Sequence, residues 1–175
     1  DIMCKVGEIV VSGGVRRSAM ISLSNLSDDR MRHAKSGNWW ETAPHRALAN
    51  NSVSYTEKPD IETFLREWTA LVESKSGERG IFNRQASKKQ AAKNGRRDTE
   101  WEFGTNPCSE IILRPYQFCN LSEVVVRATD DLKSLSNKVK LATIIGTIQS
   151  SLTKFPYLRK VWQNNTEEER LLGVS

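Results

Sequence analysis

One short segment of the sequence brings together three side chains that could do chemistry. It reads Asn106-Pro107-Cys108-Ser109-Glu110, with an amide, a thiol and a carboxylate at alternate positions. In an extended or looped segment, alternate side chains point the same way and converge on one small volume. The thiol could remove a hydrogen atom, the carboxylate could move a proton, and the amide could hold a sugar hydroxyl. A structural interpretation stays open, because Asn-Pro often starts a turn and a buried cysteine often packs as a small hydrophobe.

A second thiol follows closely along the chain. Cys119 lies eleven residues after Cys108, directly before a valine-rich segment that we expect to be a strand. A connection of that length can fold back and bring the two sulfurs together, but spacing alone leaves redox chemistry and packing both open. A zinc site is disfavoured, because there is no Cys-x-x-Cys pair and because His33 and His45 lie far away in sequence. We predict no metal site.

The elements that must position these residues follow from apolar periodicity and turn residues. Asp60 is expected to cap a strongly amphipathic helix that ends at Gly77. Strands separated by helices of ten or more residues indicate an α/β layer or barrel. Because the strands are too few to close a sheet, we expect residues 1–175 to form one incomplete segment of such a barrel. Strands are predicted over residues 15–23, 50–56 and 80–84, and the other helices over residues 2–11, 132–155 and 157–172.

Size and composition allow a folded domain and say little about specificity. A chain of 175 residues with 38% apolar residues can build a core. Part of its formal charge of +5 comes from a basic stretch, which is either a solvated face or a phosphate-contacting patch. No aromatic residue inside the stretch could stack on a base, so nucleic acid is not an expected partner. The stretch contains Lys88, Lys89, Lys93, Arg96 and Arg97.

The cysteine count and the apolar runs favour a cytoplasmic protein. Three cysteines make an odd number, and no signal-like segment opens the chain, which disfavours a secreted disulfide scaffold. Cys4 falls at the helical spacing of the first apolar segment and is expected to be a buried structural thiol. The longest apolar runs are too short to cross a bilayer. Both ends look cut, so we expect a piece of something larger.

At this point three blocks of the sequence resemble ribonucleotide reductases, especially the adenosylcobalamin-dependent class. The first resembles a barrel-strand signature, the second the active-site finger loop and the strand after it, and the third a block just beyond that loop. The sequence from Glu110 to Leu121 is more similar to that of the reductases that act on triphosphates than to that of the reductases that act on diphosphates. The blocks are VSGGVRRSA at residues 11–19, NPCSE at 106–110 with FCNLSE at 118–123, and EERLLGVS at 168–175.

The resemblance implies a fold and a role for each candidate residue. It implies a ten-stranded α/β barrel with the radical cysteine on a loop through its centre, adenosylcobalamin as cofactor and a thioredoxin-type dithiol as reductant. Cys108 would carry the thiyl radical that removes the ribose 3′ hydrogen, and Glu110 would take the 3′ hydroxyl proton. Asn106 would bind the ribose. Cys119 would be one of two cysteines that reduce the 2′ position and end as a disulfide.

The sequence also departs from the complete family pattern. The second reducing cysteine, the carboxy-terminal cysteine pair and the glycine-rich loop for substrate phosphates are not found in this chain. We therefore expect it to need flanking reductase segments or polypeptides for turnover. Two alternatives stay open: a non-catalytic piece that only completes a split barrel, and a basic module that binds nucleic acid through residues 88–97.

Overall fold

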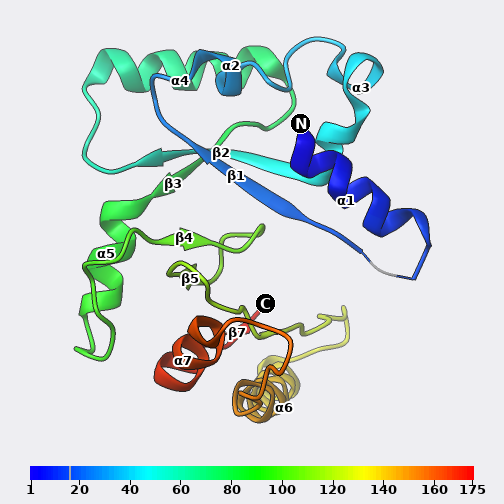
Figure 1. Ribbon diagram of the computed structural model, residues 1–175, viewed down its shortest axis with the longest axis vertical. Helices are drawn as coiled ribbons and strands as arrows, with labels where there is room; N and C mark the ends of the chain where they lie inside the picture. The colour runs from blue at the N-terminus through cyan, green and yellow to red at the C-terminus, as the bar shows by residue number, and fades with distance from the viewer. Residues whose placement is uncertain (16) are drawn as a thin grey trace.

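The computed structural model describes residues 1–15 and 17–175, which fold as a mixed α/β chain. Its central feature is a parallel sheet of three strands in the order β1-β2-β3 (Figure 1). Met20 pairs with Ala49 and Ser52 pairs with Gly80, so β2 lies in the middle. The strands are β1 (Met20–Ser24), β2 (Ala49–Tyr55) and β3 (Gly80–Asn83).

Helices connect and flank these strands, as the apolar pattern predicted. The helix at residues 2–11 is confirmed as α1, and the strand at 50–56 as β2 with a shift of one residue at each end. The predicted strand at 15–23 is confirmed only from Met20 onward, and residue 16 lies outside the described residues. The elements of this half are α1 (Ile2–Ser12), α2 (Asp29–Arg32), α3 (Trp39–Thr42), the 3₁₀ helix η1 (Pro44–Leu48), α4 (Ile61–Ser74) and α5 (Arg84–Ala92).

The second half of the chain is built on two short ladders. The strands β4 (Gly104–Thr105) and β5 (Ile112–Leu113) form an antiparallel hairpin, and β6 (Leu121–Ser122) pairs in parallel with β7 (Gly173–Val174). The two helices α6 (Leu132–Ser150) and α7 (Lys160–Glu169) lie together beside these ladders (Figure 1). Both helices are shorter than predicted.

The valine-rich segment after Cys119 does not form the strand that we predicted. Residues 124–126 have no strand structure, although the Val124 N–H donates to the Ser175 carbonyl at 2.8 Å. Val125 and Val126 are 54% and 65% exposed. A strand needs a partner along its length, and β7 ends at Val174, so the described residues supply only the first bond of a longer ladder.

The start of α4 lies where the sequence predicted, but the helix ends at Ser74, before the predicted Gly77, and its apolar stripe is not the face that it buries. The Asp60 carboxylate accepts a hydrogen bond from the Thr63 N–H at 2.9 Å, which confirms the cap. The residues that α4 buries are Glu67 and Ala70, whereas Trp68 is 51% exposed. The amphipathic stripe was read correctly as a helix signal, yet it faces away from this part of the fold.

The reason for this orientation is a buried ionic cluster between α4 and the sheet. Glu67, with a side chain only 5% exposed, accepts from Arg32 Nε at 2.5 Å and from Arg79 Nε and Nη2 at 2.9 and 2.6 Å. Arg79 also donates to Ser24 Oγ at 2.7 Å at the end of β1. A helix that presents its carboxylate to the sheet cannot present the apolar stripe there as well.

On α6, too, the large apolar side chains are not on the face that the helix buries. This helix packs on β6 and β7 through Ala142, Gly146 and Ser150, which recur at every fourth position. A Cβ on Gly146 would lie 3.2 Å from Ser122 Oγ, so a small residue lets the helix approach closely. The large apolar side chains of α6 are exposed instead, among them Leu141, Ile144, Ile145 and Ile148.

Among the described residues, no helix is long and apolar enough to cross a membrane.

Candidate functional site

The candidate cysteine lies at the tip of the β4–β5 hairpin. The Ser109 N–H donates to the Asn106 carbonyl at 3.0 Å and closes a tight turn around Pro107 and Cys108. Ser109 has a φ of 69°, in the left-handed region that turns use. The turn leaves Cys108 and Glu110 exposed to solvent. The thiol is therefore presented outward on a short, hydrogen-bonded loop.

Two asparagines hold this tip in place. Asn106 is 6% exposed, and its Oδ1 accepts from the Ile111 N–H at 3.0 Å and from Thr105 Oγ1 at 3.3 Å. Asn50, on β2 of the parallel sheet, donates through Nδ2 to the Pro107 carbonyl at 2.8 Å. The Asn106 contact joins the two sides of the hairpin, and the Asn50 contact joins its tip to the parallel sheet. Together they fix both the shape of the loop and its position on the sheet.

The expected convergence of residues 106, 108 and 110 is thus only partly seen. The chain turns at Ser109, so alternate residues do not share one face: Asn106 points into the protein, while Cys108 and Glu110 are exposed. Sequence spacing could not reveal this difference, because it depends on the turn.

Cys119 lies near the hairpin and is partly buried. Burial raises the pKa of its thiol, and electrostatic repulsion from Glu110 and Cys108 raises it further. A cavity of about 280 Å³ opens beside the sulfur. The cavity is lined by Phe118, Cys119, Asn120, Gln149, Leu152 and Phe155. The fold therefore places Glu110 and Cys108 close enough to Cys119 for electrostatic interaction.

This arrangement predicts different reactivities for the two thiols. At pH 7 to 8, Cys108 should react with iodoacetamide faster than Cys119, because Cys108 is exposed and the raised pKa of Cys119 leaves less thiolate. Glu110→Gln should lower the pKa of Cys119 and speed its alkylation several-fold, because one repelling charge is removed. Peptide mass spectrometry after timed alkylation would measure both sites. Glu62→Gln, an exposed change on α4, should leave both rates unchanged; equal effects of the two variants would contradict the placement of Glu110.

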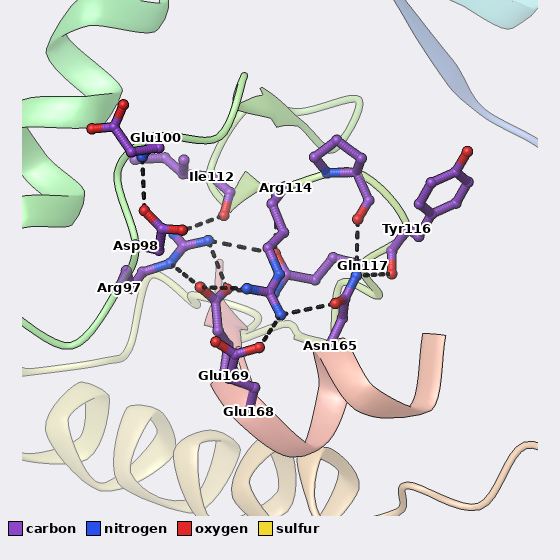
Figure 2. A network of polar contacts seen from close by, with 11 residues as sticks. Arg97, Asp98, Glu100, Ile112, Arg114, Tyr116, Gln117, Asn165, Glu168 and Glu169 are labelled. Carbon is purple, nitrogen blue, oxygen red and sulfur yellow. Dashed lines mark hydrogen bonds and ion pairs between the residues drawn. The ribbon is translucent and has the colours of Figure 1, made fainter. Parts of the chain in front are cut away.

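Behind the hairpin lies a polar network that sequence reasoning missed. Glu169 is 2% exposed and accepts from Arg97 Nε at 3.2 Å and Nη2 at 2.9 Å, and also from Gln117 Nε2 (Figure 2). Arg97 was predicted to lie on a basic face or phosphate patch, but its guanidinium is turned inward to this carboxylate and stacks on Phe103. The partners are 72 residues apart in sequence. No local pattern could have paired them.

The remaining candidates have structural positions. Cys4 is 4% exposed, so the prediction of a buried thiol is confirmed. His33 is exposed, and His45 Nε2 lies 3.0 Å from Asp1 Oδ1. In the basic stretch, Lys89, Lys93 and Arg96 are exposed, as a solvated face would be.

The fold and the site together define a mixed α/β protein with two neighbouring thiols, one presented on a hairpin tip. The chain is 37% identical over its whole length to the adenosylcobalamin-dependent ribonucleoside-triphosphate reductase of Lacticaseibacillus paracasei. It is 35% identical, again over its whole length, to the reductase of the same name from Lactobacillus leichmannii. A third relative of that name, from Levilactobacillus brevis, is 34% identical over 71% of the chain.

These relatives show which family the chain resembles and how much of it is present. The chain spans 23% of the first and second relatives and 16% of the third. No family model matches the chain, and no solved structure matches it. Over its whole length the chain thus corresponds to one segment of the adenosylcobalamin-dependent ribonucleoside-triphosphate reductases, which confirms the resemblance seen in its motifs.

Proposed function

We propose that this chain is the segment of a ribonucleotide reductase that carries the substrate-activating cysteine, and that Cys108 is this residue. The observation that carries the proposal is the position of Cys108: exposed at a hairpin tip that Asn106 and Asn50 anchor. A hydrogen-abstracting sulfur must be reachable by its substrate, and the geometry of its loop must not change during the reaction. The match to reductase relatives over the whole chain supports the same assignment.

The residues of the hairpin divide the first step between them. The Cys108 sulfur radical takes the hydrogen atom from ribose C3′, so that an S–H bond forms and the C3′–H bond breaks. Glu110, exposed beside it, accepts the proton of the 3′ hydroxyl. The Asn106 side chain is buried and its oxygen is engaged with the Ile111 N–H, so Asn106 first of all holds the hairpin that carries Cys108; its amide nitrogen is the atom left to donate to the ribose.

Cys119 serves the reductive step. Together with a second cysteine outside this sequence, it supplies two electrons and two protons: one proton leaves with the 2′ hydroxyl as water, one hydrogen is delivered to C2′, and the two sulfurs form a disulfide. Cys108 then returns its hydrogen atom to C3′. The raised pKa of Cys119 suits this role, because a protonated thiol can give up hydrogen whereas a thiolate cannot. A thioredoxin-type dithiol would restore the reduced pair.

The cofactor implied by the family fits this chain in one respect. Adenosylcobalamin would supply the radical chemistry that activates Cys108, and the exposure of that thiol lets a group held by other segments reach it. No residue of this chain is assigned to cofactor binding.

We further propose that residues 1–175 form one part of a ten-stranded barrel with the Cys108 hairpin as its central loop. β1 and β3 are the outer strands of the described sheet, so each offers an edge to further strands. The exposed apolar faces of α4 and α6 supply surfaces on which neighbouring helices would pack.

The test is reconstitution from pieces. The purified chain is mixed with polypeptides that supply the flanking reductase segments, adenosylcobalamin, a dithiol and ribonucleoside triphosphates, and deoxynucleotide formation is measured. We expect product only when the chain is present. Ribonucleoside diphosphates, tested in parallel, decide the phosphorylation state of the substrate.

Binding without turnover is the outcome that contradicts the proposal. If the pieces form a stable complex by gel filtration but no product appears, the chain is a structural complement of the barrel. Cys108 would then be reinterpreted as a loop residue without chemistry.

A further inference from the structure

The Glu169 carboxylate binds two different segments of the chain at once. Arg97, which precedes the hairpin, contacts both of its oxygens, and Gln117, which follows the hairpin, donates to it as well. The same Arg97 guanidinium donates through Nη1 to the Ile112 carbonyl on β5 at 3.0 Å. Glu169 therefore holds the base of the Cys108 hairpin from the end of α7 (Figure 2).

A second set of contacts extends the network into the connection between the two thiols. Arg114, 4% exposed, donates to Asn165 Oδ1 at 2.8 Å. Asn165 Nδ2 in turn donates to the carbonyls of Pro115 and Tyr116, each at 2.9 Å. The chain between Cys108 and Cys119 thus lies against α7 along its middle part.

The other end of this connection is held by the strand that follows α7. Glu169 is four residues before Gly173, the first residue of β7, and β7 pairs with β6, which begins two residues after Cys119. The Gly173 N–H donates to the Asn120 carbonyl at 2.8 Å. A Cβ on Gly173 would lie 2.6 Å from Ile111 Cδ1, so β7 also lies directly against the hairpin.

We propose that Glu169 is a positioning residue that sets the placement of Cys119 relative to the Cys108 hairpin. It binds the hairpin base through Arg97 and the connection through Gln117, while the strand after it holds the far side of Cys119. The inference rests on the proposed function for its catalytic meaning, because Cys108 and Cys119 must act on adjacent carbons of one sugar.

A purely stabilising role explains the network less well. Burying charges costs several kcal/mol per ion before any pairing, so apolar residues of similar size could fill this volume at similar or better stability. What apolar packing does not supply is direction: bonds from Glu169 to Arg97 and Gln117 fix the relative orientation of three segments. In addition, Arg114 Nε is buried without a hydrogen-bond partner among the described residues, and such an unpaired donor lowers stability rather than raising it.

The experiment compares Glu169→Gln and Arg97→Lys with Glu167→Gln in the complex assembled from this chain and its flanking polypeptides. Glu167 lies on the same helix but is exposed, and within the part of the chain that the structure describes its side chain accepts a hydrogen bond from Gln163 alone. The primary measurement is the pH profile of Cys119 alkylation, resolved by peptide mass spectrometry. Turnover and KM for the ribonucleoside triphosphate are measured beside it, and the melting temperature confirms that each variant folds.

We expect Glu169→Gln to shift the Cys119 profile toward lower pH, because a displaced thiol is less buried and lies farther from Glu110 and Cys108. Turnover should fall about tenfold or more with KM nearly unchanged, since a misplacement of about 1 Å can cost that much. Arg97→Lys should act in the same direction but less. Glu167→Gln should match the wild type.

An unchanged Cys119 profile in the folded variants overturns the inference, whatever happens to turnover. If Glu169→Gln does not fold, the milder Arg97→Lys decides. If the wild-type complex makes no deoxynucleotide, the proposed function fails, and the Cys119 profile still decides whether Glu169 positions that thiol.

Discussion

Replacing Cys108 with serine is expected to abolish deoxynucleotide formation by the assembled enzyme, with a loss of at least about 10³-fold, as when an essential nucleophile is removed. Serine has nearly the same size, but its O–H bond is too strong to exchange hydrogen atoms with a sugar carbon. Because the side chain is exposed, its replacement leaves no cavity. The fold and the assembly should therefore be intact, as checked by circular dichroism and gel filtration.

Cys4→Ala is the matched control for this prediction. Cys4 is buried on α1, away from the hairpin, so its loss should cost some stability but leave turnover in the folded complex close to the wild type. Full activity of Cys108→Ser would remove Cys108 from the mechanism. Activity lost in both variants would point to misfolding rather than chemistry.

The largest effect on stability is expected at Glu67, between α4 and the parallel sheet. Glu67→Ala leaves Arg79 buried without its carboxylate and leaves Arg32 with the exposed Asp29 carboxylate alone, and breaking a buried ion pair in this way costs about 3–5 kcal/mol. Urea unfolding followed by circular dichroism would measure the loss in the free energy of unfolding. Glu62→Ala, on the same helix, removes only an exposed pair with Arg66 and should have little effect.

Glu67 should also make stability depend on pH in the acid range. Its burial acts to raise the pKa, but hydrogen bonds from Arg79 and Arg32 outweigh this effect, and the pKa lies below the ordinary value of 4.5. The stabilisation is therefore fully present above pH 4.5 and is lost as the pH falls through the lower pKa of the folded state. In Glu67→Ala this part of the acid sensitivity should disappear. If the free energy of unfolding of the variant falls with decreasing pH as it does in the wild type, other carboxylates account for the acid sensitivity.

Local signals were sufficient for much of the fold. The Asp60 cap and the apolar repeat predicted α4, and the alternation of helices and strands predicted an α/β layer or barrel, of which the structure shows a three-stranded parallel sheet. These features depend on residues a few positions apart, which is the range over which helix periodicity and capping act. The direction in which α4 faces depends on Arg79 and Arg32 and could not be predicted in the same way.

The candidate site, like the fold, was in part predictable from the sequence and in part decided by the tertiary structure. The amino-acid sequence by itself identified Cys108, Glu110, Asn106 and Cys119, since their residue types and spacing, and their resemblance to a reductase motif, are local properties of one short segment. Only the tertiary structure decided that Asn106 turns inward, that Glu110 lies near Cys119, and that Glu169 pairs with Arg97. The physical reason is that a buried charge or amide is positioned by whichever partner satisfies it, and that partner can come from anywhere in the chain.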